Sequence, residues 1–94
     1  MVTEVAQLQV DPHQAEGFEN TYLTVAPILR RQAGFQGDRL LRSIEHPGQY
    51  ILAVEWDAVA DHQRFIDSAD YPDLDGPLSE FVQEGSFAHS LTVS

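Results

Sequence analysis

The spacing of the apolar residues changes repeatedly along this chain, between the two-residue period of a β-strand and the three-to-four-residue period of a helix. Residues 2–10 alternate, which predicts a strand with Ala6, Leu8 and Val10 on one face. Residues 15–29 instead carry one apolar stripe, which consists of Ala15, Phe18, Tyr22, Val25 and Leu29. Asp11-Pro12 is a typical helix start, and Gly34 follows as a typical helix end. A strand followed by a long helix is therefore expected.

Two more alternating stretches, residues 35–45 and 49–56, lie on either side of His46-Pro47-Gly48. Proline and glycine together mark a turn, so the two stretches are expected to pair as an antiparallel hairpin. The second stretch has an apolar face, formed by Tyr50, Leu52, Val54 and Trp56, and a mixed face, formed by Gln49, Ile51, Ala53 and Glu55. We expect helices to cover the apolar face and a second subunit to cover the mixed one.

The remaining residues predict two helical segments and a last strand. Asp57 is expected to cap a helix that ends near Asp70 and whose inner side carries Ala58, His62, Phe65, Ile66 and Ala69. Leu74, Leu78, Phe81 and Val82 indicate a third helical segment, broken or bent at Gly76-Pro77 and closed by Gly85. A final strand alternates through Phe87, His89, Leu91 and Val93. The order βαββαβ predicts an α+β, ferredoxin-like fold with an antiparallel four-stranded sheet, as a single domain over residues 1–94.

The charge balance excludes several classes of partner. The chain has five arginines, no lysine and 15 acidic residues, for a formal charge of −10. Nucleic acid and acidic membrane surfaces are therefore not expected as partners, because both need basic side chains. The lack of cysteine excludes disulfides, thiolate nucleophiles and cysteine metal sites. Neither a signal peptide nor an apolar stretch of roughly 18 residues is visible, so we expect a cytoplasmic protein.

The stretch VAPILRRQAGFQGDRLLRSIEHPGQYILAVEWDAVADHQRFIDSADY, together with this order of elements, resembles the antibiotic biosynthesis monooxygenase domain. Its most recognisable pieces are residues 27–35, where a helix ends in Ala-Gly-Phe, and Val54-Glu55-Trp56 followed by Ala-Asp-His-Gln. The resemblance implies a homodimer built as a dimeric α+β barrel. It also implies a choice of chemistries, which includes cofactor-free oxygenation of phenols and anthrones, quinol oxidation, haem degradation, and isomerisation or cyclisation of small ligands.

Particular positions follow from the same resemblance. Cofactor-free members use a tryptophan at the end of strand three, an asparagine four residues earlier and a tyrosine on the next helix. These positions are Trp56, Leu52 and His62 here, so only the tryptophan is kept. Haem-degrading members need an asparagine on strand one, a tryptophan in helix two and a later histidine. Those positions hold Ala6, Phe65 and Asp75, so we expect no haem to be bound.

An enzyme without metal or flavin can use O2 if the substrate itself is the reductant. The protein then supplies a dry aromatic pocket, a base and hydrogen-bond donors. His62 is the candidate base, because an unpaired imidazole on the apolar side of a helix is costly, and Trp56 is a candidate donor. Both also have a purely structural interpretation, in which they only fill the core. His89 falls on an inner face, where packing against a partner subunit is the simpler account.

The candidate substrate-binding residues are Leu52, Phe18, Tyr22 and Phe65 as walls, Tyr71 as a hydroxyl contact and Arg42 as a partner for an anionic substrate. Arg42 has an alternative role as an ion-pair partner within the hairpin. No metal site is expected, because the acidic residues Asp67, Asp70, Asp73 and Asp75 lack the spacing of a calcium loop.

The sequence thus predicts a homodimeric, cofactor-independent monooxygenase that oxidises a small phenol, quinol or anthrone-like substrate to a quinone with O2. The first alternative is an isomerase or cyclase of a small polyketide-like ligand in the same pocket, and oxygen uptake separates it from an oxygenase. The second alternative is a non-catalytic ligand-binding dimer, which is favoured if the chain fills the pocket with its own side chains.

Overall fold

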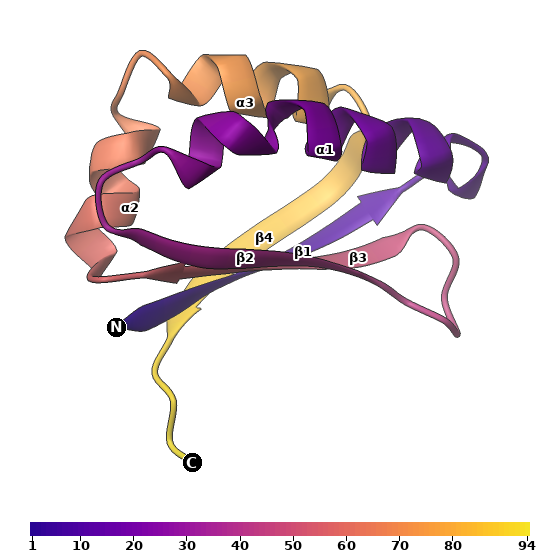
Figure 1. The fold of residues 1–94 in the computed structure, drawn as a ribbon. Coiled ribbons are helices and arrows are strands. Elements are labelled where there is room, and N and C mark those ends of the chain that lie inside the picture. Colours follow the sequence, from indigo (N-terminus) through magenta and orange to yellow (C-terminus); the bar gives the residue numbers. More distant parts are fainter.

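A computed structural model describes all residues 1–94, and three α-helices lie on one face of its four-stranded sheet (Figure 1). The elements are β1 (Val2–Val10), a 3-10 turn (Pro12–Gln14), α1 (Ala15–Arg30), β2 (Phe35–Arg42), β3 (Gln49–Trp56), α2 (Val59–Ile66), α3 (Tyr71–Ser79) and β4 (Val82–Ser90). The strand order is β2-β3-β1-β4, and every neighbouring pair is antiparallel. The predicted ferredoxin-like fold is confirmed. The last residues leave the sheet on the side away from the helices (Figure 1).

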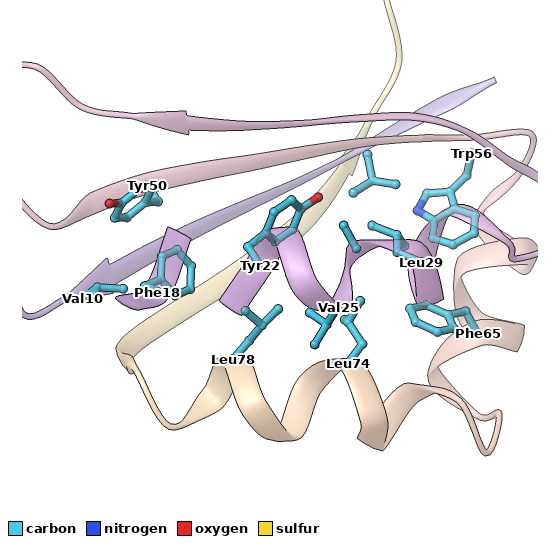
Figure 2. Close-up of a cluster of buried hydrophobic side chains, with 12 residues drawn as sticks. Val10, Phe18, Tyr22, Val25, Leu29, Tyr50, Trp56, Phe65, Leu74 and Leu78 are labelled. Atoms are coloured by element: carbon cyan, nitrogen blue, oxygen red, sulfur yellow. The ribbon is translucent and has the colours of Figure 1, made fainter. Parts of the chain in front are cut away.

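The core lies between α1 and the inner face of the sheet, as the apolar stripe predicts. Four of the five stripe residues, Phe18, Tyr22, Val25 and Leu29, are buried. They meet the apolar face of β3, where Val54 and Trp56 have almost no exposed surface. Burial of each such side chain stabilises the fold by roughly 1.5–3 kcal/mol. Phe18 and Tyr50 lie at one end of this core and Trp56 and Phe65 at the other (Figure 2). No helix is both long enough and apolar enough to span a bilayer.

Two predicted boundaries in the first half of the chain are wrong. Asp11 caps a separate 3-10 turn by accepting from the His13 N–H, at 2.9 Å, and α1 begins only at Ala15. The second strand ends at Arg42 and not at Glu45. The Ser43 hydroxyl there accepts from the His46 N–H, at 3.0 Å, so the chain turns before it reaches the predicted Pro-Gly turn.

Helix α2 is shorter than predicted, and its cap is a different residue. The N-cap position is Ala58, and the Asp61 carboxylate accepts from the Ala58 N–H at 3.0 Å, whereas Asp57 accepts from Gln36. The helix ends at Ile66, so Ala69 is outside it. Ala58 and Ala69 are exposed, and the inner side is formed by His62 and Phe65.

The predicted break at Gly76-Pro77 and the predicted start of the last strand are also wrong. Helix α3 continues through Pro77 to Ser79, because Leu74 and Leu78 anchor it on the core. Strand β4 begins at Val82, and Gly85 lies inside it opposite Leu8. A Cβ at Gly85 would come within 3.2 Å of the Leu8 side chain, so this glycine allows close packing and does not close a helix. The strand ends at Ser90, before Leu91 and Val93.

Candidate functional site

Polar side chains meet on the inner face of the sheet where α2 covers it. Glu4 lies on β1, with Val54 of β3 on one side and His89 of β4 on the other. Trp56 ends β3. Helix α2 follows at once and places His62 over this part of the sheet, because its inner side faces the core. The site thus draws one residue from each of three strands and one from a helix.

These residues contact one another in series, and two of the three contacts are hydrogen bonds. Trp56 Nε1 donates to Glu4 Oε1 at 3.1 Å, and His62 Nε2 lies 3.2 Å from the same oxygen. The other ring nitrogen of His62, Nδ1, lies 2.8 Å from His89 Nε2. We call Glu4, His62 and His89 the imidazole–carboxylate chain. We assign the proton of the neutral His62 to Nε2, which faces a carboxylate oxygen, so that Nδ1 accepts from His89 Nε2.

Burial disfavours the charged forms of Glu4 and His62. Burial raises the pKa of Glu4 above its ordinary value, although the Trp56 hydrogen bond acts in the opposite direction. Burial, followed by the nearby His89, lowers the pKa of His62 to about 4. His62 is therefore a neutral imidazole at physiological pH. No arginine forms an ion pair with Glu4.

The imidazole–carboxylate chain connects the core to an open surface. Trp56 is fully buried and stacks on the His62 ring, with centroids 5.4 Å apart. His62 is only 4% exposed, whereas His89 is exposed and Phe87, two residues before it on β4, is 56% exposed. The rings of His62 and Phe87 meet edge to face at 5.4 Å, and those of Phe87 and His89 at 5.9 Å. We call His62, Phe87 and His89 the aromatic corner, which presents an aromatic wall next to an imidazole.

Some of the predicted substrate-binding residues lie near this site. The Phe65 ring is 6.1 Å from Trp56 and 5.4 Å from Tyr71. The Tyr71 hydroxyl donates to Asp75 at 3.3 Å. Leu52 is half-buried against the core on the same face of β3 as Trp56. Phe65 and Tyr71 therefore lie beside Trp56, and Leu52 lies further along the same face of β3.

The other predicted substrate-binding residues are elsewhere. Phe18 is fully buried and packs on Tyr50 with ring centroids 4.8 Å apart. Tyr22 donates its hydroxyl to Asp38, and Arg42 forms an ion pair with Glu19 at 3.1 Å. Of the expected walls, Phe18 and Tyr22 are themselves buried and lie away from Trp56, on which His62 stacks (Figure 2).

Two open grooves lie outside the core. One, of about 530 Å³, runs between α1 and β2 and includes Tyr22 and Arg42. The other, of about 800 Å³, extends from the β2–β3 hairpin across residues of all four strands and includes Ile51. Neither groove includes His62 or Trp56. No group of three or more His, Asp or Glu side chains has an arrangement suited to a metal ion.

Glu4 and the role of His89 were missed at the level of sequence. A usable signal existed for Glu4, because strict alternation puts it on the face of Ala6, Leu8 and Val10. An acidic residue on a buried face needs partners, and this requirement marks a polar site. For His89 only packing on a partner subunit was expected, and its contact with the His62 ring was missed.

Sequence comparisons place the chain among known proteins. The sequence model of the family described as antibiotic biosynthesis monooxygenase matches residues 1–74. The uncharacterized protein YczJ of Bacillus subtilis is 30% identical over 82 residues, which are 86% of each chain. A 42.8 kDa protein in the whiE locus of Streptomyces coelicolor is 28% identical over 93 residues, and the chain spans 23% of its length.

Solved structures show the same fold. A Bordetella bronchiseptica protein named for the same family has a TM-score of 0.94 and 32% identity, over 99% of this chain and 97% of that one. SnoaB of Streptomyces nogalater, a cofactor-independent oxygenase, has a TM-score of 0.85 over 99% of this chain and 93% of its own. At 20% identity the second likeness shows the fold alone.

Proposed function

The chain belongs to the antibiotic biosynthesis monooxygenase family, and on that premise we propose that it oxidises a small phenol- or anthrone-like substrate to a quinone with O2 and without a cofactor. The observation that carries this proposal is the imidazole–carboxylate chain, which ends at the aromatic corner. It combines a proton acceptor with a flat aromatic surface, and a phenol or anthrone needs both. SnoaB, which shares the fold, is a cofactor-independent oxygenase.

The reaction needs only the substrate as reductant. A base removes one proton from an anthrone-like CH2 group, and the resulting anion gives an electron to O2. The two radicals combine into a peroxide anion, which takes up a proton and then loses water. One oxygen atom becomes the new carbonyl and the other leaves as water, so substrate and O2 give quinone and water in equal amounts. Among these steps the protein contributes most to the first, since removal of the proton sets the rate at which the anion forms.

The buried residues support this first step. Trp56 has its N–H committed to Glu4, so it positions the carboxylate and does not face a substrate. Glu4 in turn fixes the Nε2–H form of His62. Phe65 and Tyr71 pack behind this group and keep water away from it. The exposed Phe87 ring is the surface on which an aromatic substrate stacks.

Oxygen consumption with a panel of anthrones and phenols tests the proposal. We expect wild-type turnover, and a decrease of about 10²–10⁴-fold in a folded His62→Ala variant, the range for losing an acid–base group. His62→Gln restores a hydrogen bond but no base, so it should restore little activity. His46→Ala is the matched control, because His46 is exposed in the hairpin turn. An unchanged rate in folded His62→Ala would refute a role of the imidazole–carboxylate chain in turnover.

The same assay separates the alternatives. An isomerase or cyclase would convert a polyketide-like ligand under nitrogen as fast as under air. A non-catalytic dimer, which the filled interior between Phe18 and Trp56 would also suit, would bind such a ligand without any product. Product that requires O2 and consumes it in equal amount supports the oxygenase.

We also propose that the active form is a homodimer that pairs the sheet faces left bare by the helices (Figure 1). On that face Leu41 and Ile51 are 44% and 41% exposed, beside the groove of about 800 Å³. Apolar side chains on an open sheet face are typical of an interface between subunits. Sedimentation should show a dimer at micromolar concentration and a monomer for Ile51→Glu. A wild-type monomer would contradict the proposal.

A further inference from the structure

We propose that His89, and not His62, takes the proton from the substrate, and that the proton is relayed through His62 to Glu4. This inference rests on the proposed function, because it assigns the entry point and the final position of the proton in that reaction. Nothing in the likeness to SnoaB bears on it. It follows from how the three side chains are connected and from which of them a substrate can reach.

Both ring nitrogens of His62 are engaged inside the protein. Nε2 faces Glu4 Oε1 at 3.2 Å, and Nδ1 faces His89 Nε2 at 2.8 Å. With 4% of its surface exposed, His62 has no nitrogen lone pair that a substrate can reach. His89 differs, because only its Nε2 faces His62 and its side chain lies on an exposed strand beside Phe87. The Nδ1 lone pair of His89 is therefore the proton acceptor of the aromatic corner.

The transfer balances as a shift of three protons along fixed heavy atoms. Before it, Glu4 is ionised, and both His62 and His89 carry their protons on Nε2. The substrate proton binds His89 Nδ1, the His89 Nε2 proton moves to His62 Nδ1, and the His62 Nε2 proton moves to Glu4 Oε1. Afterwards Glu4 is a neutral acid and both imidazoles are neutral. The site has gained one proton, and the substrate has become an anion.

The charges around the site favour this final state. Burial raises the pKa of Glu4 and lowers the pKa of His62 to about 4, so the buried pair holds the extra proton best as a neutral acid beside a neutral imidazole. The titratable groups that face Glu4 from the other helices are Tyr22 of α1 and Tyr71 of α3. Burial raises the pKa of both tyrosines, so both stay neutral. No cation is present to hold Glu4 in its ionised form.

The first test of the relay uses activity. His89→Ala should lower turnover by about 10²–10⁴-fold, and added imidazole should restore part of it, with a rate that depends on the basicity of the imidazole used. A residue that only packs would not be replaced by a free base in this way. His46→Ala serves as the control that imidazole should not affect. If folded His89→Ala keeps the wild-type rate, the relay is refuted.

The second test needs no substrate, so it separates the relay from the proposed function. Nitrogen-15 NMR of labelled histidine should show the Nε2–H form of His62 at neutral pH and its change to the Nδ1–H form as the pH falls. The carboxyl carbon-13 shift of Glu4 should change over the same pH range, and Glu4→Gln should abolish the change at His62. A His62 that keeps Nε2–H throughout refutes the relay even if O2 is consumed. The expected change without any O2 consumption would support the relay and refute the proposed function.

Discussion

Two carboxyl groups lie against the core on either side of Val54, Asp38 on β2 and Glu4 on β1, but only Asp38 has an arginine partner. At the α1–β2 edge, Arg30 pairs with Asp38 at 2.9 Å and Arg42 pairs with Glu19 at 3.1 Å. Glu4, which α2 covers, has only neutral neighbours: it accepts from the Trp56 N–H and lies 3.2 Å from His62 Nε2. The first arrangement stabilises a fixed charge, whereas the second leaves a charge that a single proton can remove.

The pKa values of the carboxyl groups follow this difference. Burial raises the pKa of Asp38, but hydrogen bonds from Arg30 and Tyr22 lower it by more, so it lies below the ordinary value. Burial also raises the pKa of Glu4, and the single Trp56 hydrogen bond does not reverse this effect. The tyrosines of the charged edge respond as well, because burial and Glu19 raise the pKa of Tyr50 to about 12. The two carboxyl groups therefore favour opposite protonation states, which supports a structural role for Asp38 and the proposed role of Glu4 as a proton acceptor.

The largest expected effect separates packing from function. Phe18→Ala should lower the free energy of unfolding by about 3–5 kcal/mol, because the ring is fully buried and leaves a cavity. Urea denaturation measures this loss. Turnover per folded molecule should stay at the wild-type value, since Phe18 lies at the opposite end of the core from Trp56 (Figure 2). If the alanine variant does not fold, the milder Phe18→Leu replaces it in the same measurement. A loss of specific activity in either variant would show that Phe18 is a substrate wall.

Asp38→Asn should lower the free energy of unfolding by about 1–3 kcal/mol at pH 7, because Arg30 and Tyr22 lose a charged acceptor. The folded pKa of Asp38 lies below the ordinary value of 3.8, so its stabilisation is present above that pH and is lost as the pH falls through the folded pKa. The difference between wild type and variant should therefore decrease as the pH falls below 3.8. Denaturation at pH 7 and pH 3 measures it, and a difference that persists unchanged at low pH would show that packing, not charge, is lost.

His62 should make the α2 end sensitive to acid. Its folded pKa of about 4 lies below the ordinary 6.5, so the unfolded chain binds a proton at this residue more readily than the folded protein does. The folded protein therefore keeps its full stability above pH 6.5 and loses part of it as the pH falls towards 4. Between pH 7 and pH 5 the wild type should lose about 2 kcal/mol more stability than His62→Gln, which does not titrate. Urea denaturation at the two pH values checks this, with His46→Gln as the control that should behave as wild type.

Periodicity predicted the order of the elements and most of the core, because burial of an apolar stripe is decided locally. It placed β4 and the end of α2 wrongly, since those boundaries depend on pairing between distant segments. Gly85 shows the reason: glycine suits a helix end, but here it makes room for the Leu8 side chain on the neighbouring strand.

Only part of the candidate site could be predicted, because local spacing places a residue on a face but does not show its distant partners. The position of His62 on the inner side of its helix followed from local spacing, and so did the position of Trp56 at a strand end. Their partners did not, because Glu4 lies 52 residues before Trp56 and meets it only through the strand register. His89 meets Glu4 only through the pairing of β4 with β1, which local spacing does not supply.

Glu4→Gln should have the opposite sign to Asp38→Asn. The folded pKa of Glu4 lies above its ordinary 4.5, so the ionised form costs stability above the folded pKa and this cost is absent below pH 4.5. An amide oxygen still accepts from Trp56, so the variant should be more stable than wild type by on the order of 1 kcal/mol at pH 7. Turnover should nevertheless fall, because the proton has no final acceptor. Glu80→Gln is the exposed control, and a destabilised Glu4→Gln would remove the contrast between Glu4 and Asp38.

The smallest effect is expected at Arg42, which the sequence offered as a partner for an anionic substrate. Its ion pair with Glu19 joins side chains that are 66% and 32% exposed, so solvent screens it, and Arg42→Gln should cost less than about 1 kcal/mol. Glu19 also keeps the Tyr50 hydroxyl as a donor. Because Arg42 lies in the groove between α1 and β2 and not at the aromatic corner, KM and kcat should match those of Arg39→Gln, which removes an equal charge from the same groove. A raised KM for Arg42→Gln alone would move substrate binding to that groove and give the charged edge a function.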